Sequence, residues 1–375
     1  MHLVTLEVHD FRNVERASLA PSRGTTVLHG PNGQGKTNLL EAIYLLATLK
    51  PLRAARLAEL VRFGASRARV SAAVEAAGGE RRLWVEVEAG GRQAFLDGKP
   101  VDRPEAYLEG QAAVCFTPDD LLLVKGGPLL RRRFLDRAAF NRWPAVLGEA
   151  REYLKALRER NAALRGDSPE VEESFRAALA RAGARLLRRR QALVAELAPR
   201  LAGAFASIAG PEAPLARLRY RPAAGMPPEG EEAALERRLG EILALRLASD
   251  RIRGYTSVGP HMDDLTLALD ERGARAYASQ GQQRALVLAL KIAEIDNLRA
   301  AMGRPPLLLL DDVSSELDPE KSRLLLRYLA DLRAQAFLTT TDRRLVEPAV
   351  GLDAVFYRVR SGTFSMDDSA ASSTT

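Results

Sequence analysis

The chain has 375 residues, of which 46% are hydrophobic and 27% are charged. That composition is typical of a soluble globular protein, and the length is sufficient for two compact units. The single cysteine, Cys115, excludes an intramolecular disulfide, and the sequence has neither a signal-peptide pattern nor an apolar run of about 18 residues. We therefore expect a protein of the reducing cytoplasm without a membrane partner.

The net charge is +7, from 55 Lys and Arg against 48 Asp and Glu. A positive balance favours a polyanionic partner such as nucleic acid, although an arginine-rich composition also follows from a high-GC genome. Arginines cluster at 131–133 and 188–190, and we expect each cluster to present two or more guanidiniums to solvent, where planar forks suit phosphate oxygens. The alternative is a solvated helix face. The candidate DNA contacts are Arg131, Arg132, Arg188 and Arg189.

The first part of the chain is rich in β-branched and alternating apolar residues, which indicates strands. Glycine pairs at 78–79 and 90–91 separate several of them, and Asp97-Gly98 is typical of a two-residue hairpin turn. The predicted strands cover 3–8, 17–19, 25–29, 69–74 and 83–88, with a hairpin joining 95–96 to 99–101. We expect one mixed β-rich lobe.

Residues 30–37 read Gly-Pro-Asn-Gly-Gln-Gly-Lys-Thr and fit the GxxxxGK[ST] spacing of a phosphate-binding loop. Glycines let successive backbone N–H groups turn toward a β-phosphate, and the next helix adds its positive dipole end. A predicted strand at 25–29 and an apolar helix at 38–46 supply the strand–loop–helix order. We expect Lys36 to reach the β- and γ-phosphates and Thr37 to bind Mg²⁺. The other nucleotide-binding candidates in and beside this loop are Gly30, Asn32, Gly33, Gln34, Gly35 and Asn38.

From about residue 129 the apolar period changes from two to between three and four, which predicts helices. One stripe covers 147–164 and the next covers 175–205, and between them Gly166 can close one helix while Ser168 can cap the other. We expect an antiparallel helical hairpin, with Pro199 kinking or ending its second helix. A Pro- and Gly-rich loop then leads to a third helix over about 231–253.

Residues 279–284, Ser-Gln-Gly-Gln-Gln-Arg, open a predicted helix over about 282–301. A helix N-terminus with free amides and a serine hydroxyl is an anion site. Because the chain already has its own phosphate loop, we expect Ser279, Gly281 and Gln282 to act on a nucleotide bound to a second copy.

Four leucines at 307–310 precede two acids, as in a buried strand of a parallel sheet that delivers carboxylates at its C-terminal end. Phosphoryl transfer requires a clamp for negative charge and a placed nucleophile. We expect Asp311 to hold the metal through water and Asp312 to orient the attacking water, so that Asp312 and Lys36 are the catalytic candidates. The alternative for Asp312 is a helix cap.

The order of these motifs resembles that of the RecF family, bacterial recombination mediators within the SMC-like branch of the ABC ATPases. The resemblance covers most of the chain and includes a D-loop-like Ser-Glu-Leu-Asp at 315–318. Its segments are residues 6–13, 30–37, 117–121, 126–128, 131–136, 259–261, 279–284 and 311–318.

The resemblance implies an α/β fold, with an ABC-type P-loop ATPase head and mixed β-sheet lobe at 1–123 and 254–366. An inserted, mainly α-helical lobe with an antiparallel helical arm is expected at 124–253, and a disordered tail at 367–375. By the same match, Lys36 and Thr37 correspond to Walker A, Asp311 and Asp312 to Walker B, and Ser279 and Gly281 to the trans-acting signature loop.

The implied cofactors are ATP and Mg²⁺, and the implied partners are single- and double-stranded DNA, in particular gapped or junction DNA. The family resemblance further implies an ATP-dependent homodimer that acts with RecR and RecO and so assists RecA loading in the cytoplasm, at the nucleoid. Weak, DNA-stimulated ATP hydrolysis is expected to release it. The expected processes are recombinational repair, replication-fork maintenance and the SOS response.

The chain departs from the family pattern at three places. Met262 follows Gly-Pro-His where a basic residue is usual, which puts a phosphate contact there in doubt. Asp312 replaces the glutamate common in the wider superfamily, so we expect slow hydrolysis. Gln111 is only the nearest candidate for a Q-loop glutamine.

Two other protein classes are disfavoured by spacing. A transporter subunit has roughly a hundred residues between P-loop and signature loop, whereas Lys36 and Ser279 are 279 − 36 = 243 positions apart. A chromosome-structuring SMC protein has hundreds of heptad residues, against a helical insert of about 125 residues here. Another SMC-like ATPase, or a nucleotide-gated structural DNA clamp without a RecA-loading role, remains the alternative.

Overall fold

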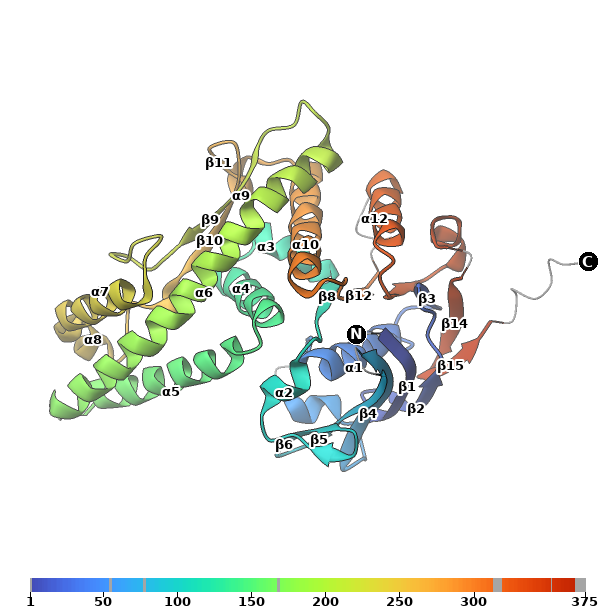
Figure 1. The fold of residues 1–375 in the computed structure, drawn as a ribbon, viewed down its shortest axis with the longest axis horizontal. Coiled ribbons are helices and arrows are strands. Elements are labelled where there is room, and N and C mark those ends of the chain that lie inside the picture. The colour runs from blue at the N-terminus through green and yellow to red at the C-terminus, as the bar shows by residue number, and fades with distance from the viewer. Residues whose placement is uncertain are drawn as a thin grey trace, which may run out of the picture. The chain divides into compact units, whose positions relative to one another are not determined.

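A computed structural model describes residues 2–53, 56–76, 79–166, 169–312, 319–351 and 353–367. The chain forms two compact units, Met1–Asp120 together with Leu298–Thr375, and Leu121–Asn297 (Figure 1). Residues 254–297, which the sequence-based division assigns to the ATPase head, fall in the second unit, and that functional division stays a prediction. Several predicted features lie outside the described residues: the first glycine of the turn at 78–79, the cap at Ser168, the D-loop-like segment 315–318 and the tail from 368.

The first unit contains a six-stranded sheet in the order β15-β14-β3-β13-β12-β8. Five of its strands are parallel, namely β3 (Thr25–His29), β8 (Ala113–Phe116), β12 (Leu307–Leu310), β13 (Ala336–Thr340) and β14 (Val355–Arg360), and β15 (Thr363–Met366) is antiparallel to β14. All four leucines of β12 are fully buried, as expected for a strand covered on both faces. Helix α1 (Lys36–Thr48) follows β3, and α12 (Pro319–Asp331) precedes β13.

A second six-stranded sheet of this unit is antiparallel, in the order β2-β1-β4-β5-β6-β7. It confirms the predicted β-rich segment, including the hairpin in which Leu96 pairs with Lys99. Asp97 and Gly98 both have positive φ, +49° and +84°, as the tight turn requires. The strands are β1 (His2–Phe11), β2 (Val14–Leu19), β4 (Arg67–Ala76), β5 (Gly79–Glu88), β6 (Gly91–Leu96) and β7 (Lys99–Pro100), and the short helices of this unit are η1 (Leu57–Leu60), α2 (Pro104–Leu108), η4 (Arg343–Leu345) and η5 (Glu347–Ala349), with η2 (Pro118–Leu121) at its end.

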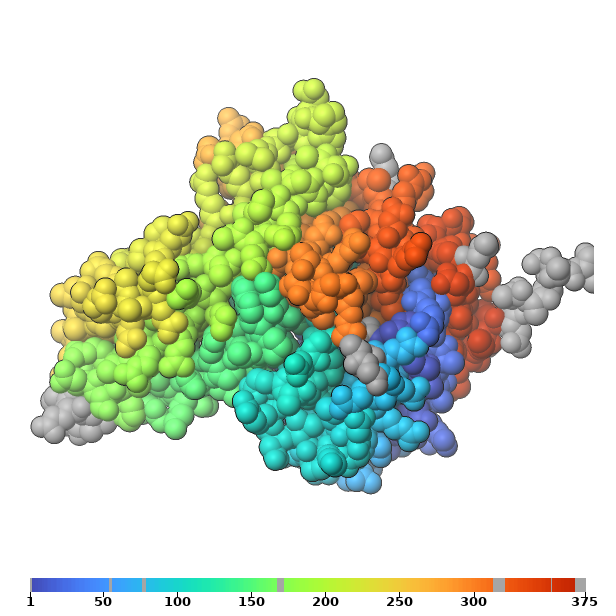
Figure 2. All heavy atoms as spheres, in the orientation of Figure 1, coloured from blue at the N-terminus to red at the C-terminus, as the bar shows by residue number. Residues whose placement is uncertain are grey.

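The second unit is mainly helical, and α5 (Val146–Leu164) and α6 (Pro169–Ala209) form the predicted hairpin (Figure 1). Helix α6 continues through Pro199 to Ala209, so the expected early end is not found. The predicted third helix is two, α7 (Glu232–Leu245) and α8 (Leu247–Arg253). Figure 2 shows α7 in yellow packed along α6 in green. The remaining helices are α3 (Leu122–Lys125), α4 (Pro128–Arg142), η3 (Pro260–Met262), α9 (Ala274–Tyr277) and α10 (Gln280–Met302).

A three-stranded antiparallel sheet, β11-β10-β9, completes this unit. Its strand β9 (Ala216–Arg221) pairs along its whole length with β10 (Asp264–Leu269), and β11 (Arg272–Gly273) is short. The sequence pattern did not predict β9. Its only apolar alternation covers a few residues between a long helix and a Pro-rich loop, and its partner strand lies more than forty positions later in the chain.

One helical stretch of the described residues, Glu172–Ala209 in α6, is long and apolar enough to cross a membrane by length and composition alone. Its large apolar side chains Leu193, Leu197, Leu201 and Phe205 are buried in the hydrophobic core of the second unit. The helix also carries the buried charges Glu172 and Arg190. These features are those of a core helix in a globular unit.

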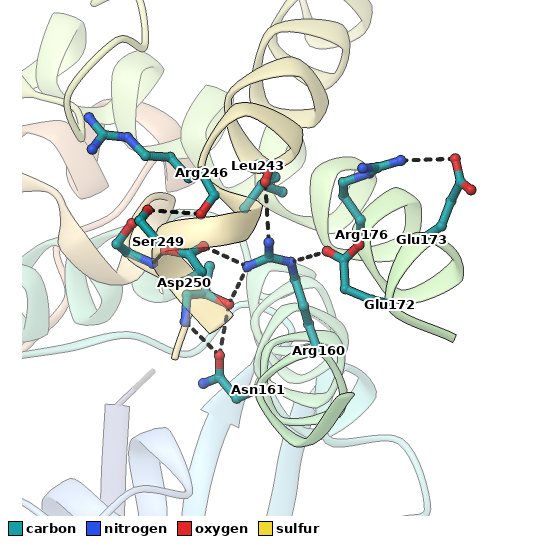
Figure 3. Close-up of polar contacts among 11 residues, drawn as sticks. Arg160, Asn161, Glu172, Glu173, Arg176, Leu243, Arg246, Ser249 and Asp250 are labelled. Carbon is teal, nitrogen blue, oxygen red and sulfur yellow. Dashed lines mark hydrogen bonds and ion pairs between the residues drawn. The ribbon is translucent and has the colours of Figure 1, made fainter. Parts of the chain in front are cut away.

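A buried ion network joins the elements at the end of the helical hairpin (Figure 3). Arg160 of α5 is fully buried and donates to Glu172 of α6 at 2.9 Å and to Asp250 of α8 at 3.0 Å. The same guanidinium donates to the Thr256 hydroxyl at 2.8 Å and to the Leu243 carbonyl at 3.3 Å. Every charge is therefore both paired and hydrogen-bonded, which is the condition under which buried charges are tolerated.

A second buried network surrounds Arg190 of α6. Its guanidinium donates to Asp136 of α4 at 2.7 Å, to Asp263 at 3.2 Å and to the Pro260 carbonyl. The Tyr220 hydroxyl also donates to Asp263. Burial raises the pKa of Asp263, against the influence of Arg190 and Tyr220. This network holds the Gly-Pro-His loop against α6 and β9.

Candidate nucleotide-phosphate site

The phosphate-binding loop lies between the carboxyl end of the central strand β3 and the first turn of α1. Gly30 has φ of +144°, and a Cβ built on it would lie 2.5 Å from the Val359 carbonyl oxygen. Gly35, the residue before the helix, has φ of +111° and would place a Cβ 2.8 Å from the Asn13 side-chain oxygen. Both positions therefore require glycine. The absence of a side chain lets the loop backbone pack closely against Val359 and Asn13.

Lys36 lies at the start of α1 with only 7% of its surface exposed. Its ammonium group donates to the Pro31 carbonyl at 2.8 Å and to the Gly30 carbonyl. Burial lowers its pKa, an effect that the negative charges of Asp312 and Asp311 oppose. The side chain thus lies folded over the loop, with its charge on carbonyl groups of the loop itself.

Thr37 and Asp311 meet although they are 274 positions apart in the sequence. The Thr37 hydroxyl donates to a carboxylate oxygen of Asp311 at 2.7 Å, and the Thr339 hydroxyl at the end of β13 donates to the same oxygen at 3.0 Å. Asp311 is 2% exposed. Hydroxyl and carboxylate oxygens are the ligands that Mg²⁺ prefers, so these residues fit the expected ion.

The Arg53 guanidinium forms an ion pair with the other carboxylate oxygen of Asp311. The Arg53 backbone N–H donates to Glu41 of α1 at 3.0 Å, and Glu41 also accepts from Arg12 at 2.9 Å. Glu41, a buried acid on the helix that follows the phosphate loop, thus positions the Arg53 guanidinium beside Asp311, the candidate metal ligand.

Asp312 has a positive φ of +50°, a conformation that Asp tolerates better than most residues. Its backbone N–H donates to the Thr339 hydroxyl at 2.8 Å. Thr339 therefore bridges both acids, as it donates to Asp311 and accepts from Asp312. The conformation of Asp312 is that of a residue in a sharp turn, and the structure does not show it capping a described helix.

The rest of the loop is fixed by contacts from outside the motif. The Gln34 side-chain oxygen accepts from the Ser361 N–H at 2.7 Å, and the Gln34 carbonyl accepts from the Gly362 N–H at 2.8 Å. Asn38 donates to the Asn13 side chain at 2.8 Å. Asn32 and Gly33 are exposed at the tip, where they are open to a ligand.

The signature-like loop lies in the second unit, at the start of α10. The Gln282 N–H donates to the Ser279 hydroxyl at 3.2 Å, and the Ser279 N–H donates to the Gln282 side chain at 2.9 Å. This reciprocal pair is a capping box, which has an N-terminal structural role of its own. Ser279 and Gly281 are exposed. Their action on a second copy stays a prediction.

Gln111 does not lie at the nucleotide edge of the parallel sheet. It precedes β8, and since β8 is parallel to β12, the residue is at the amino end of the strand, whereas the phosphate loop is at the carboxyl end of β3. Its side chain donates to the Tyr107 carbonyl. The structure therefore gives no support for a Q-loop role at this position.

His261 forms hydrogen bonds through both of its ring nitrogens. One ring nitrogen lies 2.9 Å from the Thr256 carbonyl and must donate, so the other accepts from the Tyr153 hydroxyl. Burial lowers the pKa of His261, and this arrangement is that of a neutral ring. Met262, beside it, is 49% exposed.

The arginine clusters differ from the prediction that each presents two or more guanidiniums to solvent. Arg131 is buried and forms two hydrogen bonds with Asp264, at 2.7 and 3.0 Å, and Arg132 donates to the Asp263 carbonyl at 2.7 Å. In the second cluster Arg189 pairs with Glu149 at 2.9 Å, and Arg190 is buried. Only Arg133 and Arg188 are exposed. The physical reason is that carboxylates and carbonyl groups from distant segments accept from the others, whereas Arg188 pairs at 3.2 Å with Glu231, which is itself exposed.

Three residues of the site, Thr339, Asn13 and Ser361, were not predicted from the sequence. Thr339 lies in Thr-Thr-Thr-Asp at the end of a buried strand, and polar residues at the carboxyl end of a parallel strand are a usable signal. Nothing local marks the other two residues, since both lie in turns that reach the loop only in the folded chain. No motif marks Arg53, the partner of Asp311.

Comparison with known proteins agrees with this geometry. Residues 2–363 match the family described as the RecF/RecN/SMC N terminal domain. A DNA replication and repair protein RecF from an Anaeromyxobacter species is 70% identical over 97% of this chain and 99% of its own length, and one from Myxococcus xanthus is 56% identical over 96% of each.

A solved structure of the recombination mediator RecF with ATP, of the RecFOR pathway, superposes with a TM-score of 0.88 at 29% identity. It covers 98% of this chain and 97% of its own. The mixed sheets and the long helical arm are thus those of an α/β ABC-type ATPase of the SMC-like branch. With its phosphate loop joined to the acids of β12, the chain belongs to the RecF family.

Proposed function

We propose that this protein is an ATP-dependent DNA-binding protein of recombinational repair and replication-fork maintenance. The observation that carries the proposal is the 2.7 Å hydrogen bond between Thr37 and Asp311, which joins a phosphate loop to a metal-binding acid. Relatives named for DNA replication and repair, at up to 70% identity over nearly the whole chain, support the biological process.

The proposed mechanism assigns the phosphates to the loop amides and to Lys36, which would leave the Gly30 and Pro31 carbonyls for the phosphate oxygens. Thr37 and Asp311 would hold Mg²⁺, which supplies charge neutralisation between the phosphates when bound. Asp312 would orient the attacking water and accept its proton. Because an Asp reaches less far than a Glu, we propose slow hydrolysis that acts as a switch.

We propose that Arg53 leaves Asp311 when a divalent cation binds, a step that the sequence motifs do not predict. Its guanidinium holds the oxygen of Asp311 that faces away from Thr37, so a divalent cation entering beside Thr37 competes with it for the same carboxylate. The pair keeps the buried acid satisfied when no cation is bound. Release of Arg53 would accompany loading of the site.

Ser279 and Gly281 are exposed at the start of α10, and we propose that this loop contacts a nucleotide held by a second copy. ATP would then favour a homodimer, and hydrolysis would favour its dissociation. The proposed ligand of the dimer is gapped or junction DNA, with RecR and RecO as partners and RecA loading as the outcome, in the cytoplasm. Exposed Arg188 and partly exposed Arg132 and Arg189 are the proposed DNA contacts, and Arg131 is the least accessible of the original four.

Fluorescence anisotropy with gapped duplex DNA tests the proposal. Binding is measured without nucleotide, with ATP and with ADP, for the wild type and for Lys36→Met, across a salt series. We expect ATP to tighten binding, the variant to lose that gain, and log K to fall by about 0.9 per neutralised phosphate with log salt. An affinity for DNA that is the same without nucleotide, with ATP and with ADP would contradict ATP-gated binding.

The remaining alternative is a clamp in which ATP is mainly structural. Asp312→Asn separates the two, because it keeps the size of the side chain and removes the proton acceptor. In a hydrolytic switch, the variant stays on DNA much longer than the wild type after ATP is chased with ADP. In a clamp that opens by nucleotide exchange alone, the two dissociation rates are equal.

A further inference from the structure

The short helix α8 carries an exposed surface that mixes aliphatic, aromatic and basic side chains. Ile252 is 90% exposed, Leu245 at the end of α7 is 80% exposed, and Tyr255 just after α8 is 49% exposed. These three large apolar side chains are exposed within residues 245–255 of the chain, and exposed apolar side chains that are close together mark interaction sites more often than isolated ones do. We call the following residues the α8 surface: Leu245, Arg246, Arg251, Ile252, Arg253 and Tyr255.

The charges of the α8 surface all have one sign. Arg246, Arg251 and Arg253 are exposed, and the structure gives none of them a carboxylate partner among the described residues. The stem of a fourth arginine, Arg165, lies beside Gly254, since a Cβ on that glycine would be 3.4 Å from the Arg165 side chain. The one acid of α8, Asp250, is fully buried.

The buried ion network explains why these side chains face outward. Asp250 is bound to Arg160 and also accepts from the Ser257 N–H at 3.2 Å, while Gly254 closes the helix with φ of +72°. In Figure 3 Asp250 points inward to Arg160, and the Arg246 side chain points away from it. A helix of seven residues has little stability of its own, so the network is what holds this surface in one conformation.

We propose that the α8 surface is a docking site for a partner protein, specifically for an acidic segment that also carries apolar side chains. Asp and Glu side chains of that segment would pair with the arginines, and its apolar side chains would cover Ile252, Leu245 and Tyr255. Arginine and tyrosine are enriched among the residues that carry binding energy at protein interfaces. A nucleic-acid backbone would use the arginines, but it would leave the two aliphatic side chains in water, and for that reason we favour a protein.

The probe is a fluorescein-labelled peptide in which Asp and Glu alternate with Phe, Ile and Leu, titrated with the full-length protein without nucleotide. A second peptide has Ser in place of every apolar residue, and a single-stranded oligonucleotide of equal net charge is the third probe. We expect the apolar acidic peptide to bind at least tenfold more tightly than the Ser peptide. Since no nucleotide is present, the result does not depend on ATP-gated DNA binding.

The variants are Ile252→Ser and Arg251→Glu, and the matched controls are Leu154→Ser and Arg151→Glu, two exposed residues of α5. We expect each α8 variant to weaken peptide binding about tenfold or more, and each control to stay within about twofold; a tenfold change is about 1.4 kcal/mol. All four substitutions are at exposed positions, so circular dichroism should show an unchanged fold.

Three results would overturn the proposal. The first is equal binding of the Ser peptide, or binding that Ile252→Ser leaves unchanged, because the apolar contacts would then play no part. The second is tighter binding of the oligonucleotide with a loss only in Arg251→Glu, which would make this surface a nucleic-acid contact. The third is no saturable peptide binding up to about 1 mM, which corresponds to about −4 kcal/mol.

Discussion

Replacing Arg160 by methionine tests how much the buried ion network contributes to the end of the helical hairpin. The substitution keeps an unbranched apolar stem and removes the guanidinium, so Glu172 and Asp250, which are 1% and 0% exposed, lose their counter-ion. Breaking a buried ion pair by removing one partner costs about 3–5 kcal/mol. Here one guanidinium donates to both carboxylates and to the Thr256 hydroxyl, so we expect the loss of local stability to lie within this range.

The effect is local, because the network joins α5, α6 and α8 of one unit. Global unfolding of a chain with two units need not be two-state, and hydrogen exchange is therefore the better assay. Since about 1.4 kcal/mol is a tenfold change in an equilibrium constant, amides of α8 and of the first turns of α6 should exchange about two to four orders of magnitude faster. Amides of the parallel sheet in the first unit should be unchanged.

Arg176→Met is the matched control, one turn further along the same helix as Glu172 (Figure 3). Arg176 also forms an ion pair, with Glu173 at 2.9 Å, but Glu173 is 74% exposed. A solvated pair of this kind is worth about 0–1 kcal/mol, so its loss should change exchange by less than about tenfold. If Arg160→Met exchanges no faster than this control, the reasoning from burial is wrong.

Three further predictions concern the site and its surroundings. Gly30→Ala should abolish binding of a fluorescent ATP analogue, because its Cβ would lie 2.5 Å from the Val359 carbonyl at φ of +144°; retained affinity would show that the loop can shift. The folded protein should lose stability as the pH falls below 6.5 toward the lowered pKa of His261, because the unfolded state binds the proton more readily. Denaturant unfolding of His261→Gln should lack that part of the pH dependence. Arg53→Gln should increase Mg²⁺ affinity several-fold by calorimetry, because a competitor for Asp311 is removed; a decrease would mean that Arg53 helps to hold the loaded site.

Local pattern was enough to predict those elements whose residues are close together in the sequence. The glycines, Lys36 and Thr37 of the phosphate loop need only a strand before them and a helix after them, and the structure has both. The four leucines before Asp311 predict a strand buried on both faces, and that strand lies within the parallel sheet. The apolar stripe at 147–164 likewise gives α5 nearly to the residue, whereas α6 extends beyond the stripe at 175–205 at both ends.

Tertiary structure decided which charges are available to a ligand. Sequence presents Arg131, Arg188 and Arg190 as equivalent members of two clusters, yet Arg131 is paired with an acid 133 positions away, Arg190 with one 73 positions away, and only Arg188 of the three is exposed. The Arg53–Asp311 pair and the α8 surface were equally outside the reach of local pattern. The physical reason is that strand and helix formation follow from the periodicity of neighbouring side chains, whereas the exposure of a charge depends on which distant partner the fold brings to it.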